Sequence, residues 1–474
     1  MKHPKLWRSA STWSARILTV ALVSHAPAWA QVDVQSLTPD QRWFYKVYKE
    51  LVETNTTHSV GSTTVAAKQL AAHLREAGLP SSDIQIFEPF ERKGNIVARF
   101  KGDGSKRPLL LLGHLDVVEA KAEDWKLNPF KLNEEGGYFT ARGAIDDKAK
   151  VAAYVSAVAQ LKREGIVPKR DIVMVFTADE ERLDVPSNGA KWLAANHPGL
   201  LQAEFGLNEG GGGLLKNGKP YVNRIQLAEK VSVTYEYSVS NKGGHSAWPR
   251  SDNAIYELTD ALNRVASYRF PANPGEAVKV FLRRSAALES GQQAQDMLAV
   301  AQGQADDAVI ERLTKDVLYN AQLRTTCVAT MVNAGHAENA LAQSAKSTIN
   351  CRVLPHEDPS VVDAKLRELA GSNVTVTMVN PPLKSPPSPM RDDVLGAVED
   401  VTQQMWPGVP VIPTMSNGAT DSRYLRNLGV PIYGVTGLFT DSPNGTHGLN
   451  ERIEIKRLFE GREFIYQLIK RLAN

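Results

Sequence analysis

Residues 109–116 read Leu-Leu-Leu-Leu-Gly-His-Leu-Asp, an apolar run that ends in a histidine and a carboxylate. Four consecutive leucines without polar alternation are typical of a strand that is buried on both faces of a parallel sheet. Residues 171–177 (DIVMVFT) repeat this pattern and lead into an acidic segment. Apolar residues recur at helical spacing over 64–78 and 148–162. This alternation predicts an α/β domain with a mixed, largely parallel sheet.

The pattern of the chain changes near residue 229. The elements expected beyond this point are a strand, a helix, two strands, a helix and a strand, over 231–240, 253–267, 326–332, 347–354, 360–369 and 374–379. This βαββαβ order is the ferredoxin-like motif, with an insertion before its second strand. A proline-rich linker at 381–389 precedes the return of the α/β pattern. We therefore expect a discontinuous α/β domain over 31–226 and 383–474, which carries an inserted α+β domain over 227–382.

Composition and charge exclude several classes of protein. With 42% hydrophobic and 23% charged residues, the chain of 474 residues is neither disordered nor a coiled-coil rod. Without the four basic residues of 1–30, the basic count falls from 55 to 51 against 52 acidic residues, which does not indicate a nucleic-acid-binding surface. The basic start, the apolar run at 17–23 and the sequence Ala28-Trp29-Ala30 predict a signal peptide over 1–30. The mature protein would then be periplasmic or secreted, without membrane attachment.

Histidines and carboxylates collect where the predicted strands end. His114 and Asp116 follow the first apolar run, and Glu180 and Glu181 follow the second. Further candidates in loops or at a helix start are Asp146, Asp147, Glu209 and His447. Because the carboxyl ends of parallel strands meet at one edge of a sheet, we expect these groups to lie together. Taken singly, the adjacent aspartates could instead cap a helix, and the glutamates could form a solvated charge run.

These residue types point to a hydrolytic metal site. Nitrogen and oxygen ligands without sulfur favour zinc, with cobalt or manganese as alternatives. A carboxylate shared by two ions would hold them roughly 3.5–4 Å apart.

The ordered motifs identify a family resemblance. They are GHLD at 113–116, RGAIDDK at 142–148, TADEE at 177–181, NEGG at 208–211 and THGLNER at 446–452. With the inserted βαββαβ region, this set resembles the M20 family of di-zinc metallopeptidases, which includes carboxypeptidases, dipeptidases and aminoacylases. The M28 aminopeptidases have similar ligands but lack such an insertion. The resemblance implies that the α/β domain is catalytic and that the inserted domain is a lid.

The resemblance implies five ligands for two zinc ions, namely His114, Asp146, Glu181, Glu209 and His447. Asp146 would bridge the ions and would be followed by an unusual peptide bond to Asp147. Asp116 would orient His114, and Glu180 would be the general base. A glutamate at position 209, where other members carry aspartate, resembles the carboxypeptidase and aminoacylase branch.

The same resemblance implies four residues that contact the substrate, His245, Asn339, Arg352 and Gly418. Arg352 would bind a substrate carboxylate through its forked donors. His245 would reach into the site of a second subunit, so the lid would also form a homodimer.

The expected activity is that of an exported di-zinc hydrolase. It would use a metal-activated water to cleave the amide bond of a peptide or an N-acyl amino acid, in the manner of a carboxypeptidase. Two alternatives stay open: an M20 hydrolase of a non-peptide amide, and a peptide-binding relic without catalysis. The complete set of ligand and base residues argues against the relic.

Two cysteines, Cys327 and Cys351, fall in predicted strands that should pair antiparallel. A register that sets these cysteines opposite each other also sets Met331 opposite Ser347. Opposed Cβ atoms are about 4.5–5.5 Å apart, which is near disulfide range, and export would permit oxidation. We therefore predict a disulfide, although a shift of one residue would place the two thiols on opposite faces of the sheet.

Overall fold

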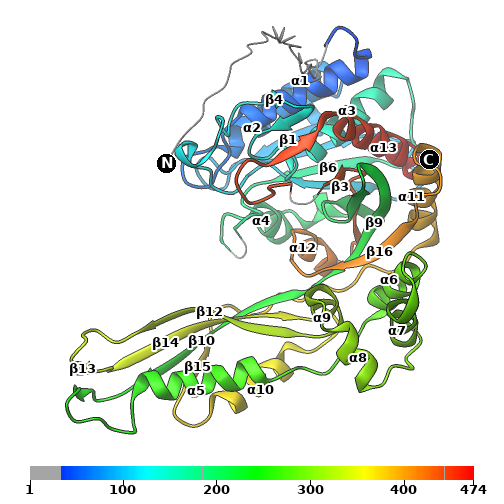
Figure 1. Cartoon of the computed structure of the whole chain (residues 1–474). Helices are drawn as coiled ribbons and strands as arrows, with labels where there is room; N and C mark the ends of the chain where they lie inside the picture. Colours follow the sequence, from blue (N-terminus) through cyan, green and yellow to red (C-terminus); the bar gives the residue numbers. More distant parts are fainter. Residues whose placement is uncertain (1–33, 183–184, 442–443) are drawn as a thin grey trace, which may run out of the picture.

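The chain forms a layered α/β body and a second, elongated sheet that projects from it (Figure 1). The computed structural model describes residues 34–182, 185–441 and 444–474. The predicted signal peptide at 1–30 lies outside these residues. Within the described ranges, no helix is both long enough and apolar enough to cross a membrane.

The first sheet has ten strands and is parallel at its centre. Along the sheet they are β1 (Ile84–Phe87), β2 (Asn95–Phe100), β6 (Ile172–Thr177), β3 (Leu109–His114), β7 (Phe205–Asn208), β17 (Ile432–Gly434), β9 (Lys219–Glu229), β8 (Gly212–Lys216) and β18 (Phe439–Thr440), with β16 (Val411–Ser416) paired to β9. The four strands β6, β3, β7 and β17 run parallel to their neighbours in this central group. Strands β1 and β2 are antiparallel at one side, as is the β8–β9 pair at the other. The predicted parallel core is thus confirmed.

Helices cover both faces of this sheet because its central strands are apolar on both sides. Leu109 and Leu111 of β3 belong to one buried core, whereas Leu110 and Leu112 belong to another. The helices of the first core are α1 (Pro39–Glu53), α2 (Thr63–Glu76), α3 (Lys148–Arg163), α11 (Asp392–Met405) and α13 (Ile455–Ala473). The helices of the second core are α4 (Gly189–Asn196) and α12 (Ser422–Asn427). The four leucines at 109–112 therefore separate two apolar layers.

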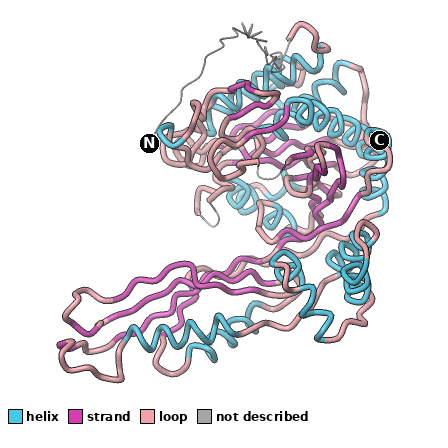
Figure 2. Tube along the Cα trace, viewed as in Figure 1, coloured by secondary structure: helices cyan, strands magenta, loops and turns pink. Residues whose placement is uncertain are grey.

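The second sheet has the predicted ferredoxin-like topology. Its antiparallel strands lie in the order β12 (Thr326–Ala334), β14 (Ser344–Val353), β10 (Val231–Ser240) and β15 (Thr375–Met378). Helices α5 (Ala254–Ser267) and α10 (Pro359–Ala370) pack on one face of it (Figures 1 and 2). The chain passes from the first sheet to the second at Lys230, so the boundary expected at 226 and 227 lies within β9. The division into domains otherwise stays a prediction.

The insertion before the second strand of this motif is helical. It consists of α6 (Glu276–Ala286), α7 (Gly291–Ala301), α8 (Asp307–Leu313) and α9 (Val317–Leu323). Its apolar residues form one cluster with Ala228 of β9 and Met415 of β16. These helices therefore pack against strands of the first sheet.

Cys327 lies opposite Cys351 and is bonded to it as a disulfide, as predicted. The register expected further along the pair is wrong by one residue. A β-bulge between Ala329 and Met331 places Val332, and not Met331, opposite Ser347. A bulge inserts one extra residue into one strand, which a pattern of alternating residues does not reveal.

Short elements complete the fold. They are the strands β4 (Asn133–Glu135), β5 (Tyr138–Thr140) and β19 (Arg452–Glu454), the ribbon of β11 (Gly244–His245) and β13 (Ala340–Leu341), and the 3-10 turns η1 (Ser81–Asp83), η2 (Ala122–Asp124) and η3 (Pro198–Leu201).

Candidate metal centre

His114 ends β3 at the edge of the sheet where the other candidates gather. Its ring is buried, and Nδ1 lies 3.0 Å from the backbone carbonyl oxygen of Asp116. Because a carbonyl oxygen only accepts hydrogen bonds, Nδ1 carries the proton and donates it. Nε2 is thereby directed towards Asp146 Oδ1, at 2.9 Å. This is the arrangement that leaves Nε2 as the metal-binding nitrogen.

Asp146 lies between the two candidate histidines. Its Oδ1 faces His114 Nε2 at 2.9 Å, and its Oδ2 faces His447 Nε2 at 3.0 Å. The peptide bond from Asp146 to Asp147 is cis, which agrees with the expected unusual linkage. One oxygen towards each histidine is the geometry of a carboxylate that can serve two ions.

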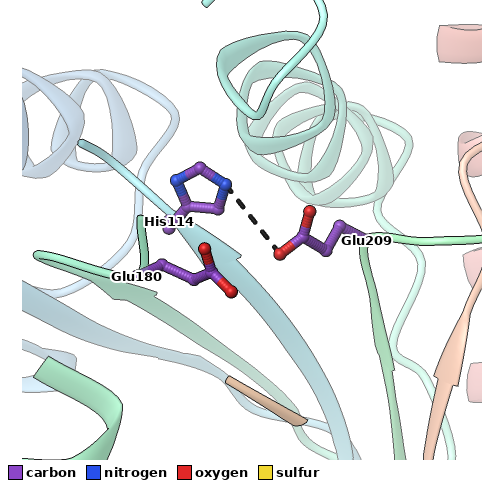
Figure 3. A group of neighbouring side chains, drawn as sticks. All are labelled: His114, Glu180 and Glu209. Atoms are coloured by element: carbon purple, nitrogen blue, oxygen red, sulfur yellow. Dashed lines mark ion pairs between the residues drawn. The ribbon is translucent and has the colours of Figure 1, made fainter. Parts of the chain in front are cut away.

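The three glutamates approach this pair from different sides. Glu209 Oε1 lies 3.9 Å from His114 Nε2, whereas Glu181 Oε2 lies 3.0 Å from His447 Nε2. Glu180 is buried. A carboxylate oxygen of Glu180, a carboxylate oxygen of Glu209 and a ring nitrogen of His114 lie within 4.8 Å of one another. Figure 3 shows these three side chains converging on one space. Atoms of Glu181, Asp146 and His114 also lie within 4.8 Å of one another. Each histidine therefore has Asp146 and one nearer glutamate beside it, Glu209 at His114 and Glu181 at His447.

Asp116 contacts the glutamate pair as well as His114. Its carboxylate oxygens accept hydrogen bonds from the backbone N–H groups of Glu180 and Glu181, each at 3.1 Å, and Oδ1 is 3.6 Å from His114 Nδ1. The nearest acceptor for the ring is thus the Asp116 carbonyl. The Asp116 carboxylate mainly fixes the backbone of Glu180 and Glu181.

The electrostatics of the site favour bound cations. Burial and nearby carboxylates raise the pKa of Glu209 to about 8 and that of Glu180 well above its usual range. Hydrogen bonds to Asp146 and Glu181 raise the pKa of His447 to about 10. Burial opposes charge on His114, but its bonds to Asp116 and Asp146 outweigh this and raise its pKa. Crowded carboxylates that repel one another are stabilised by metal ions.

The donor set itself fits zinc. It contains two imidazoles and three carboxylates with no sulfur, and it splits into two groups around a shared carboxylate. Structural and catalytic zinc sites use these ligands, and paired sites use a bridging group of this kind.

Glu451 is an important residue to which the sequence motifs assign no role. Its buried carboxylate accepts backbone hydrogen bonds from Gly143 at 3.0 Å, Ile145 at 2.7 Å and Asp146 at 3.1 Å, and an ion pair from Arg142 at 2.8 Å. It therefore holds the loop that carries Asp146. Its place four residues after His447, in the same motif, is the signal that could have identified it.

Lys150 is a second such residue. Its buried ammonium group lies 2.8 Å from Asp147 Oδ2 and 3.3 Å from Asn208 Oδ1. Asp147 Oδ2 also accepts the backbone N–H of His114 at 3.2 Å. Lys150 thus connects the residues that flank Asp146 and Glu209. The sequence feature that could have identified Lys150 is its position on an otherwise apolar helix face.

A polar cluster supports the segment before Glu180. Asp179 has a left-handed backbone, with φ of 56°. Its carboxylate contacts Lys93 at 2.9 Å, Ser187 at 2.6 Å and His58 at 3.0 Å. These contacts stabilise the turn that directs Glu180 and Glu181 towards the two histidines.

The four candidate substrate residues are not joined to this cluster. His245 and Asn339 are neighbours on the exposed β11–β13 ribbon, where Ser246 N donates to the Asn339 carbonyl at 3.0 Å. Figure 1 places β13 at the far tip of the second sheet. Arg352 lies on β14, and Gly418 lies in the turn after β16. None of the four has a hydrogen bond or ion pair to the candidate ligands within the described ranges.

Arg352 has an unusual environment. Its Nη1 is buried and has no hydrogen-bond partner among the described residues. Burial and the nearby charge of Arg423 lower the pKa of Arg352. A half-buried guanidinium with an unpartnered nitrogen and a second cation nearby is suited to an anionic ligand.

Comparisons with known proteins agree with this geometry. Residues 110–471 match the peptidase family M20/M25/M40. A probable carboxypeptidase S-like protein of Dictyostelium discoideum is 30% identical over 79% of this chain and 74% of its own length. The human N-fatty-acyl-amino acid synthase/hydrolase is 27% identical over 88% of this chain and 85% of its own. Among solved structures, an M20 family metallo-carboxypeptidase from Sulfolobus solfataricus has a TM-score of 0.70 at 18% identity, and the match covers 92% of this chain and all of that one.

Proposed function

Because this chain belongs to peptidase family M20/M25/M40, we propose that it is an exported hydrolase with two zinc ions, which cleaves the amide bond of an N-acyl amino acid or a short peptide. The family establishes a metallopeptidase or amidohydrolase of the carboxypeptidase S type. The two-ion centre, the free carboxylate of the substrate and export are parts of the proposal.

The observation that carries the proposal is the position of Asp146. One of its oxygens faces each candidate histidine, at 2.9 and 3.0 Å, and one glutamate lies beside each histidine. A peptide-binding relic would not need two complete ligand groups around one carboxylate. Zinc bound by His114, His447, Asp146, Glu181 and Glu209 would lower the pKa of a water molecule towards neutrality and polarise the amide carbonyl.

Glu180 performs the proton transfers in this scheme. Burial and the charge of Glu209 raise its pKa, so its carboxylate is a stronger base than an exposed one. It takes the proton of the attacking water and later delivers it to the departing nitrogen. The backbone N–H of Glu180 donates a hydrogen bond to Asp116 Oδ1 at 3.1 Å. This bond limits how far the Glu180 backbone can move.

Substrate recognition would use Arg352 on β14, which has Arg423 nearby. Arg352, with its unpartnered Nη1, would bind the carboxylate of the amino acid. The names of the relatives favour two substrate types, peptides with a free C-terminus and N-acyl amino acids. A non-peptide amide is the remaining alternative within the family.

The proposal is tested by metal removal combined with a matched substrate pair. We expect the purified protein to hold about two zinc ions per subunit, because paired metal sites share a carboxylate in this way. It should hydrolyse N-acetylalanine and dipeptides but not their C-terminal amides. Chelation should abolish the activity, and zinc or cobalt should restore it. Activity that survives thorough chelation would contradict the mechanism, and equal cleavage of the amides would contradict the carboxylate requirement.

A further inference from the structure

A pocket with a largely apolar lining lies between the helical insertion and the first sheet. It has a volume of about 480 Å³. Its walls come from β8, β9 and β16 on one side and from α6 and α9 on the other. Apolar and aromatic side chains line it, including Leu214, Tyr221, Phe281, Leu318, Ile412 and Met415. This size and lining are typical of a site for a small apolar ligand.

Two residues of the pocket wall directly follow a candidate metal ligand in the sequence. Gly210 and Gly211, which line the pocket, directly follow Glu209. A Cβ atom on Gly210 would lie 2.2 Å from Gln226 Oε1, and one on Gly211 would lie 2.4 Å from the Arg224 carbonyl oxygen. Only glycine permits this approach of β9. The space that their side chains would need is taken by Gln226 and Arg224 of β9, so the two glycines bring this wall of the pocket to the residue that follows Glu209.

The lining changes in character along the pocket. Near the glycines it contains the polar residues Arg224 and Gln226, and Arg224 Nε donates to the Gly212 carbonyl at 3.2 Å. Towards the helices it is mainly apolar, with the rings of Phe281 and Tyr319 6.4 Å apart, and Ser285, Glu289 and Gln322 are the polar residues of this side. Its rim includes Leu318, which is 51% exposed.

From this arrangement, which rests on the proposed function, we infer that the pocket holds the acyl chain of a medium- or long-chain N-acyl amino acid. The polar end fits the amide that is to be cleaved near Glu209. The apolar end fits the methylene chain, whose transfer from water is favourable. The helical insertion thereby determines which acyl group the enzyme prefers, whereas the metal centre determines the reaction.

The first experiment measures kcat/KM for a series of N-acylalanines with acetyl, hexanoyl, dodecanoyl and hexadecanoyl chains, each below its micelle concentration. We expect kcat/KM to rise with chain length by up to about fourfold for each methylene that the pocket buries. A flat series with measurable N-acetylalanine hydrolysis would overturn the pocket assignment and leave the proposed function intact. Failure to hydrolyse any member, or any dipeptide, would contradict the proposed function itself.

The second experiment uses neighbouring residues of α9 as variant and control. Leu318 lines the pocket, whereas Val317 is 84% exposed and does not. We expect Leu318→Asp to lower kcat/KM for dodecanoylalanine by about tenfold or more, with N-acetylalanine unchanged, because a charge opposes burial of the chain. Val317→Asp adds the same charge and should change neither substrate. Leu318→Met should restore the preference for long chains, and thermal denaturation checks that each variant is folded.

A third measurement does not depend on catalysis. Calorimetric titration of the zinc-free protein with dodecanoate should show binding that Leu318→Asp weakens by about tenfold and Val317→Asp does not, because dodecanoate carries the same buried chain. Equal behaviour of the two variants in both assays would overturn the inference.

Discussion

Glu180 and Glu181 are neighbours in sequence but have different surroundings. Glu181 Oε2 lies 3.0 Å from His447 Nε2, whereas Glu180 belongs to the group around His114 and Glu209. Asp116 holds both through their backbone N–H groups. Their side chains can therefore be changed separately without loss of this shared support.

We expect Glu180→Gln to retain metal while kcat falls by a factor of about 10² or more, because glutamine cannot accept the proton. Glu181→Gln should instead weaken metal binding, because it replaces a charged ligand at His447. Metal content by mass spectrometry and kcat on the same samples distinguish the two outcomes. The reverse result would exchange the roles of the two glutamates.

Loop 142–147 depends on a single buried carboxylate from a distant part of the chain. Glu451 accepts from three backbone N–H groups and pairs with Arg142. We expect Glu451→Gln to lower the free energy of unfolding by about 1–3 kcal/mol, because the NH2 group that replaces one carboxylate oxygen cannot accept the hydrogen bonds made to that oxygen. It should also reduce the affinity for metal, through displacement of Asp146. Urea denaturation and a zinc titration test the two effects, with Glu454→Gln on β19 as a more exposed control.

At the scale of elements, the disulfide connects the edge strand β12 to β14 across 24 residues of sequence. Closing a loop of this length restricts the unfolded chain, and we expect its removal to cost about 2–4 kcal/mol. The double variant Cys327→Ala and Cys351→Ala should therefore unfold at a lower urea concentration than the parent. Mass spectrometry of the unreduced protein supplies the direct check, since two alkylatable thiols after denaturation would exclude the bond.

The helical insertion packs on the first sheet, although the strands on either side of it in the sequence belong to the second sheet. It lies in sequence within the βαββαβ motif, yet its apolar residues cluster with Ala228 and Met415 of the first sheet. This packing forms the pocket that Gly210 and Gly211 line. The lid expected over 227–382 stays a prediction, and its helical insertion packs on strands of the first sheet.

For the whole molecule, we propose that the second sheet mediates a homodimer. Its edge strand β12 exposes Val328, Met331 and Val332, which are 60, 69 and 62% exposed. An exposed apolar edge strand is suited to pairing with another chain. His245 lies on the ribbon at the tip of this sheet, without a bond to the candidate ligands of its own chain within the described residues.

This proposal predicts complementation between subunits. A mixture of His245→Ala and Glu180→Gln chains should regain part of the activity, because one site of a mixed dimer would combine an intact base with an intact partner histidine. Activity after co-refolding, with mixed dimers verified by tagged purification, is the measurement. A verified mixed dimer without recovery would show that His245 does not act across the interface.

Local sequence determined much of the fold. The leucines at 109–112 predict a strand with two apolar faces, because every residue is apolar, and the two cores confirm it. The βαββαβ order follows from the periods of successive segments, and the facing cysteines follow from that order. The gathering of His114, Glu181 and Glu209 was likewise predictable, because strand ends of a parallel sheet converge, whereas Asp146 and His447 were assigned by the family resemblance.

Tertiary structure alone decided the features that depend on distant contacts. The one-residue shift at Met331 arises from a bulge, which leaves no trace in the alternation of residues. The roles of Glu451 and Lys150 depend on which backbone groups and carboxylates lie within hydrogen-bond reach, and the partners of Glu451 are about 300 residues away in sequence. The pocket exists only because the insertion helices pack on β9 and β16, and periodicity specifies that a helix has an apolar face but not which surface covers it.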